Sequence, residues 1–229
     1  MGQQLTFDLP VRTALGRDDF FVSPANAVAV AAIDGWQNWP GQKLVLTGPK
    51  GSGKTHLTHV WAKDALAKVL PAQNLETGQI AKLVAATPNI AVEDVETIAG
   101  NPAGERALFH LFNLVLSEGG YLLMTGSTPP ATWPLVLPDL KSRLQGSNLT
   151  LLAPPDDALL SAVLVKLFAD RQIDVQTSTI NYLTKRMERS FDAAAILVAE
   201  LDAMALTERR AITRNMANRV LDNLSDRGA

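Results

Sequence analysis

The chain has 229 residues, with 21 Lys and Arg against 23 Asp and Glu and a formal net charge of −2, so it lacks the chain-wide positive field that generic nucleic-acid binding requires. It contains no cysteine and three histidines, which excludes disulfides, thiolate metal sites and cysteine nucleophiles. No run of about 18 apolar residues and no secretory leader is present, so we expect a cytoplasmic protein without a membrane partner.

The N-terminal stretch GQQLTFDLP carries apolar residues at alternate positions, Phe7 and Leu9, and closes with Pro10. Alternation of this kind predicts an extended segment with one apolar face. Such a tail can lay alternate side chains into pockets of a partner while Gln4 exchanges hydrogen bonds at the rim. The alternative is a strand that docks on the chain's own core. We treat residues 1–12 as an N-terminal tail.

A phosphate-binding loop follows the first predicted strand, Leu44 to Thr47. The sequence GPKGSGKT matches the pattern G-x-x-x-x-G-K-T and opens a helix that we expect to run to about Val69. Glycines let backbone N–H groups turn inward around phosphate oxygens, the lysine supplies a charge for the β- and γ-phosphates, and the threonine hydroxyl suits Mg²⁺. The predicted nucleotide-binding residues are Gly48, Pro49, Lys50, Gly51, Ser52, Gly53, Lys54, Thr55 and His56.

The segment NIAVEDVE reads as a second buried strand that ends in carboxylates. We expect Glu93, together with Thr55, to hold Mg²⁺ and Asp94 to orient a water molecule. The usual order is an aspartate followed by a glutamate, and here the shorter and the longer side chain have exchanged places. Nucleotide binding tolerates this exchange, but the exchange predicts weak or no intrinsic ATPase activity.

The helical pattern in GERALFHLFNLVLSEGG leads to a third strand, Leu122 to Thr125. Apolar residues form one helical stripe, and two glycines end it. Strands that alternate with helices predict an α/β unit with a parallel sheet flanked by helices. Ser127, just after the third strand, is suited to contact the γ-phosphate or the attacking water. The stripe consists of Leu108, Leu111, Phe112 and Val115.

A proline-rich connection precedes LPDLKSRL, in which Arg143 is a candidate arginine finger; the alternative is an ordinary surface charge. The stretch APPDD then marks a boundary, with a helix expected to begin at Asp156. Only helical patterns follow it. We therefore predict an α/β nucleotide-binding subdomain over 13–153 and a small α-helical subdomain over 154–229.

Three segments in this order, GKTHLTH, LFHLFNLVLSEGGYLLMTGS and LKSRL, resemble the AAA+ core of the DnaA-type ATPases. The resemblance runs from about Asp18 to about Leu206. It implies an AAA+ P-loop NTPase core followed by a helical lid, with ADP or ATP and Mg²⁺ as cofactors. The upstream stretch FFVSPANAVAVAAI resembles the segment that borders the adenine in this family, which adds Phe21 and Val22 to the expected site.

A short tail before such a core is the layout of a DnaA-homologous regulator of bacterial replication. The resemblance implies that the tail binds the β sliding clamp of DNA polymerase III, that DNA is reached only through the clamp, and that Arg143 acts in trans on ATP bound to DnaA. The protein would then be associated with the replisome. The expected clamp-binding residues are Gln4, Leu5, Phe7 and Leu9.

One departure concerns the lid, where the family carries an arginine and this chain has Asp192 and Ala193. Loss of that cation should weaken the preference for a γ-phosphate, so ADP is expected to bind as well as ATP. The alternative function is a DNA-stimulated AAA+ ATPase of the helicase-loader or transposition-helper type. Self-association through the finger is left open by the sequence.

Overall fold

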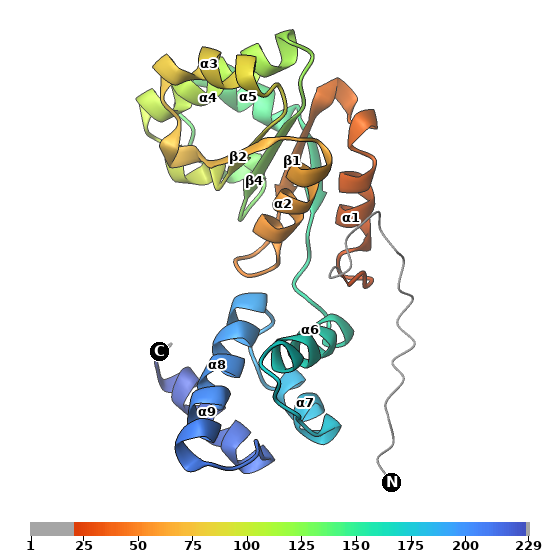
Figure 1. Ribbon diagram of the computed structural model, residues 1–229. Helices are drawn as coiled ribbons and strands as arrows, with labels where there is room; N and C mark the ends of the chain where they lie inside the picture. Colours follow the sequence, from red (N-terminus) through yellow and green to blue (C-terminus); the bar gives the residue numbers. More distant parts are fainter. Residues whose placement is uncertain (1–20, 228–229) are drawn as a thin grey trace. The chain divides into compact units, whose positions relative to one another are not determined.

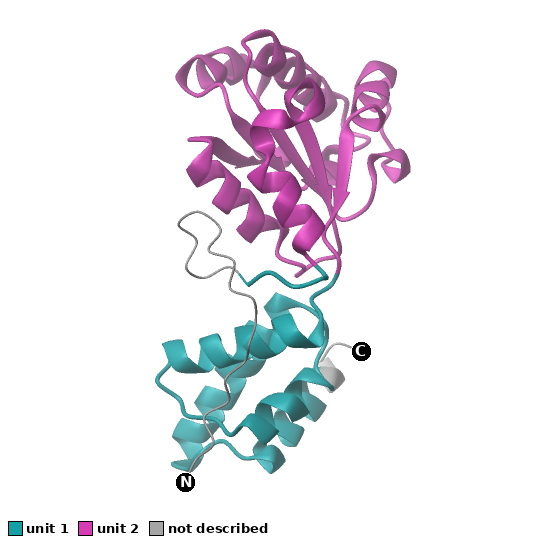
Figure 2. Ribbon diagram, turned by 90° about the vertical axis from the view of Figure 1, so that its right-hand side faces the viewer, with its two compact units in different colours: residues 1–25, 154–229 teal, residues 26–153 magenta. Residues whose placement is uncertain are grey.

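The computed structural model describes residues 21–227, and the side chains of 225–227 are not part of that description. The described chain forms two compact units (Figure 2), one of residues 26–153 and one of residues 154–227 with 21–25. The first contains the sheet and the second is helical. Among the described residues, no helix combines the length and the apolarity that crossing a membrane requires.

The first unit is built on a five-stranded parallel sheet in the order β2-β3-β4-β1-β5. The inner strands are mostly apolar and are buried along nearly their whole length, because helices cover both of their faces. In register, Val45 pairs with Met124 on one side and with Leu149 on the other. The strands are β1 (Lys43–Thr47), β2 (Lys68–Pro71), β3 (Ile90–Glu93), β4 (Leu122–Gly126) and β5 (Asn148–Leu151).

Figure 1 shows α3, α4 and α5 on one side of the sheet and α1 and α2 on the other. The stripe predicted from Leu108 to Val115 lies on α4 and is buried in the main core. The parallel sheet between helices is therefore confirmed. The α-helices are α1 (Ala27–Asp34), α2 (Lys54–Asp64), α3 (Ile80–Ala86), α4 (Pro102–Ser117) and α5 (Pro138–Gln145); the 3₁₀ turns are Trp36–Asn38, Pro40–Gln42, Ala72–Asn74, Thr77–Gln79, Val95–Ile98 and Pro130–Thr132.

The end of α2 corrects a prediction. We expected this helix to reach about Val69, but it ends at Asp64 and Val69 lies in strand β2. The helix is closed by a Schellman motif, in which the N–H of Ala67 donates to the carbonyl of Ala62 (2.8 Å) and Leu66 adopts a left-handed φ of 50°. Glycine usually occupies that position, so its absence hid the stop from sequence reasoning.

The helical unit contains α6 (Asp157–Asp170), α7 (Thr177–Thr184), α8 (Phe191–Glu208) and α9 (Arg214–Arg227). Asp156 caps α6 by accepting from the N–H of Leu159 (2.9 Å), as the sequence predicted, and Ser190 caps α8 in the same way. The four helices bury their apolar residues in one core. Its centre is formed by Leu160, Leu164, Leu183, Leu197 and Leu201.

Candidate functional site

The loop between β1 and α2 has the shape that a phosphate cradle needs. Gly51 and Gly53 adopt φ values of 71° and 95°, in the left-handed region that favours glycine. At Gly48 a Cβ atom would stand 2.3 Å from the carbonyl oxygen of Leu152, so this position has no room for a side chain. The loop then enters the N-terminus of α2, where the helix dipole and the backbone N–H groups attract anions.

The ammonium group of Lys54 lies inside this loop. Its side chain is buried, and its Nζ donates to the carbonyl oxygens of Gly48 (2.7 Å) and Pro49 (3.0 Å). A phosphate oxygen would offer this ammonium a charged acceptor in place of a neutral one, which strengthens the hydrogen bond. Thr55 and His56 are exposed on the first turn of α2, beside the lysine, and Lys50 is exposed on the loop.

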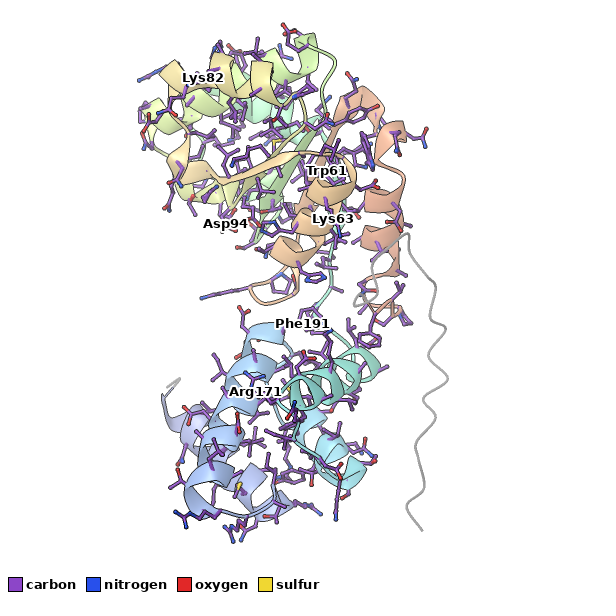
Figure 3. All side chains as sticks on the ribbon, in the orientation of Figure 1. Trp61, Lys63, Lys82, Asp94, Arg171 and Phe191 are labelled. Carbon is purple, nitrogen blue, oxygen red and sulfur yellow. The ribbon has the colours of Figure 1, made fainter. Side chains whose placement is uncertain are left out.

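The carboxyl end of β3 carries the predicted acidic pair. Glu93 is half-buried, and its Oε1 is buried without a hydrogen-bond partner in the described part of the chain. Asp94, which Figure 3 labels at the end of the sheet, has a left-handed φ of 55°. Its N–H donates to Thr125 Oγ1 of the neighbouring strand (3.0 Å), which secures this costly conformation. Backbone strain of this kind often accompanies functional sites.

Glu96 is a residue that the sequence reasoning missed. Its Oε1 accepts from both the N–H (2.6 Å) and the hydroxyl (2.5 Å) of Ser127, the residue after β4, while its Oε2 is buried and unpartnered within the described residues. Ser127 is thus oriented by a carboxylate from the turn after β3. The only sequence signal was a third carboxylate in the stretch EDVE.

The acidic residues fit a magnesium ion that is completed by phosphate oxygens. Among the described residues, no group of three or more His, Asp or Glu side chains could hold a metal ion by itself. Mg²⁺ commonly binds through one or two carboxylates together with substrate phosphates. The unpartnered oxygen of Glu93 and the exposed hydroxyl of Thr55 are the groups that would hold it, and the ion would neutralise the charge of the β- and γ-phosphates.

Arg143 lies away from the carboxyl ends of the strands. It is exposed on α5, and its guanidinium stands 5.7 Å from the ring centres of Phe109 and Phe112 on α4. Lys43, the first residue of β1, contacts the ring of Phe112 as well (5.8 Å). Arg143 is therefore near the amino ends of the strands, whereas the P loop, Glu93, Asp94 and Ser127 are at their carboxyl ends. The structure does not bring Arg143 to the chain's own P loop.

The remaining predicted residues belong to the helical unit or lie outside the described residues. Phe21 and Val22 belong to the helical unit, so their place beside an adenine stays a prediction. In that unit Asp192 and Ala193 occupy the first turn of α8, and nearby Arg189 is paired with Asp157 (2.6 Å). The expected clamp-binding residues lie outside the described residues; they are Gln4, Leu5, Phe7 and Leu9.

Known proteins similar to the chain include replication initiators. No protein-family model matches it. The chromosomal replication initiator protein DnaA of Thermomicrobium roseum is 24% identical over 221 residues, a match that covers 87% of this chain and 48% of that protein. The chain thus spans about half the length of this curated relative.

Solved structures give the same result for the fold. Domain III of DnaA from Thermotoga maritima superposes with a TM-score of 0.76 at 18% identity, over 89% of this chain and 94% of that chain. AMPPCP-bound DnaA from Aquifex aeolicus gives a TM-score of 0.64 at 17% identity, over 83% of this chain and 67% of that chain. The parallel sheet and the helical C-terminal part match the fold of these AAA+ P-loop domains of DnaA, which confirms the predicted fold class.

Proposed function

We propose that the chain binds ADP or ATP with Mg²⁺ at the P loop. The observation that carries this proposal is the conformation of the loop: two glycines with positive φ, a lysine whose charge is held among loop carbonyls, and an unpartnered carboxylate oxygen on the neighbouring strand end. The glycines let backbone N–H groups face a phosphate, and the buried, unpartnered oxygen of Glu93 costs free energy that a cation would offset. DnaA from Aquifex aeolicus was solved with AMPPCP, which supports an adenine nucleotide.

Nucleotide binding is tested with Lys54→Ala. Removing a charged hydrogen bond of about 1.5–3 kcal/mol should weaken ADP binding roughly ten- to hundredfold in isothermal titration calorimetry. The matched control is Lys63→Ala, an exposed lysine in the last turn of the same helix (Figure 3), which should bind ADP as the wild type does. Equal affinity in both variants would contradict the assignment of the P loop.

We further propose that the protein regulates replication initiation in the manner of the DnaA-homologous regulator Hda: bound to the sliding clamp through its tail, it promotes hydrolysis of ATP on DnaA and so inactivates the initiator. The position of Arg143 favours action in trans. Its side chain is exposed near the amino ends of the strands, opposite the chain's own P loop, and packs near two phenylalanine rings. An arginine finger supplied by a partner can raise phosphoryl-transfer rates by about 10³ to 10⁵.

The decisive experiment measures hydrolysis of DnaA-bound ATP in the presence of clamp loaded on DNA. Arg143→Ala should abolish the stimulation without changing clamp binding, whereas Leu5→Ala/Phe7→Ala should abolish it by preventing recruitment. Lys141→Ala, an exposed residue on the same helix as Arg143, is the matched control and should stimulate normally. Full stimulation by Arg143→Ala would refute the finger.

The same preparations test the alternative of a DNA-stimulated ATPase. The reversed lengths of Glu93 and Asp94 predict little turnover by the protein alone. Purified protein incubated with ATP and DNA, without clamp or DnaA, should therefore release almost no phosphate. Rapid turnover that depends on DNA would favour a helicase-loader or transposition-helper role and would overturn the regulatory one.

A further inference from the structure

Two arginines of the helical unit converge on one tyrosine ring. Tyr182 lies on α7, and the guanidinium carbons of Arg186, just after that helix, and of Arg214, the first residue of α9, each stand 4.5 Å from its ring centre. Arg186 also donates from Nη1 to the tyrosine hydroxyl (2.9 Å). Stacking on an aromatic face leaves the N–H edge of a guanidinium available to an anion.

The ring that supports them is itself held in place. The hydroxyl of Tyr182 donates to Asn218 Oδ1 (2.5 Å), and Asn218 Nδ2 donates to Asp222 Oδ2 (2.8 Å), one turn further along α9. The chain of hydrogen bonds ties α7 to α9, which also pack against each other. Both cations are therefore positioned before any ligand arrives, and this lowers the entropy cost of binding one.

Four other arginines of this unit form ion pairs with carboxylates. Arg171 pairs with Asp202, Arg189 with Asp157, and both Arg210 and Arg219 with Glu208. In contrast, within the described part of the chain no carboxylate forms an ion pair with Arg186 or Arg214, although both side chains are exposed.

The guanidinium carbons of Arg186 and Arg214 lie at most about 9 Å apart, twice the 4.5 Å distance to the ring centre, so their like charges repel each other and favour the binding of an anion. Lys185, also exposed, adds a third cation next to Arg186, and Glu188 is the nearest carboxylate along the chain. The feature is thus a local cationic surface on a chain whose net charge is −2.

We propose that Arg186 and Arg214 bind the phosphate backbone of duplex DNA. Planar guanidinium groups with free N–H edges match phosphate oxygens better than single point charges do. The choice of DNA as the anion rests on the proposed function, which places the protein on a clamp that encircles DNA. Because few phosphates are contacted, the binding is weak, sequence-independent and sensitive to salt, and it adds to recruitment by the tail through effective concentration.

The test is fluorescence anisotropy with a labelled duplex of about 20 base pairs and the full-length protein at about 50 mM salt, without clamp or DnaA. Arg186→Ala/Arg214→Ala should lower the affinity at least about tenfold and reduce the slope of log K against log salt by about 2. The control is Arg106→Ala/Arg171→Ala, which removes the same charge from exposed positions elsewhere and should stay within about twofold of the wild type.

Three outcomes would overturn this inference: no DNA binding by the wild type, an equal loss of affinity in the two double variants, or DNA binding by Arg186→Ala/Arg214→Ala that equals that of the wild type. A far-UV circular dichroism spectrum that matches the wild type shows that the helical unit of the variant is folded. Because the DNA-binding assay contains neither DnaA nor clamp, its result can be interpreted even if the proposed regulatory function fails. The assay of DnaA-bound ATP hydrolysis can likewise be interpreted even if direct DNA binding fails.

Discussion

A buried carboxylate should determine the stability of the sheet unit. Glu105 on α4 is fully buried, and its oxygens accept from the backbone N–H groups of Gly100 (2.8 Å), Val136 (3.0 and 3.1 Å) and Leu137 (2.7 Å). The last two residues immediately precede α5, the helix that carries Arg143. Glu105 therefore ties the proline-rich connection, which sequence correctly predicted to be irregular, to the core.

The expected magnitude follows from these contacts. A hydrogen bond to a charged group contributes about 1.5–3 kcal/mol, but the three donors are only partly buried and can recover some hydration. Glu105→Ala should therefore lower the free energy of unfolding by about 3–4 kcal/mol. Glu105→Gln keeps the shape but turns an N–H₂ group toward backbone donors, and should lower it by about 2 kcal/mol.

Urea unfolding followed by circular dichroism measures both values. Glu118→Ala, an exposed glutamate at the end of the same helix, is the control and should change the free energy of unfolding by less than about 0.5 kcal/mol. If Glu105→Ala unfolds within about 1 kcal/mol of the wild type, the carboxylate does not hold the connection as argued.

Three further outcomes follow from local geometry. Gly126→Ala should lower the free energy of unfolding by about 1–3 kcal/mol in urea titrations, because a Cβ atom there would meet Trp133 Cζ2 at 2.4 Å. Leu66→Gly should raise it by about 0.5–1 kcal/mol, since it relieves a left-handed φ at an exposed side chain. The hydrogen bond from Arg219 lowers the pKa of Glu208 in the folded protein. The contribution of this carboxylate to folding stability is therefore fully present above its unfolded pKa and is lost as the pH falls through the lower folded pKa. NMR titration should show that the pKa of Glu208 rises in Arg219→Ala.

Local signals in the sequence were sufficient for the three inner strands β1, β3 and β4, for the phosphate loop, and for the starts of α2 and α6. The apolar runs at Leu44 and Leu122 predict strands covered on both faces, and the glycines of the loop are needed because φ is positive where they stand. Where the local signal was atypical, the prediction failed. Leu66 ends α2 in a conformation that its residue type disfavours, and tertiary pairing of β2 with β3 decides the outcome.

What the sequence alone determined is the chemistry of the loop and the class of the fold, because both depend on residues that are neighbours along the chain. Only the tertiary structure decided which distant groups meet: Glu96 with Ser127, Glu105 with the segment before α5, and Arg186 with Arg214 on one ring. It also decided that Arg143 and the P loop occupy opposite ends of the sheet. These contacts join residues far apart in sequence, and their partners are selected by packing rather than by any local pattern.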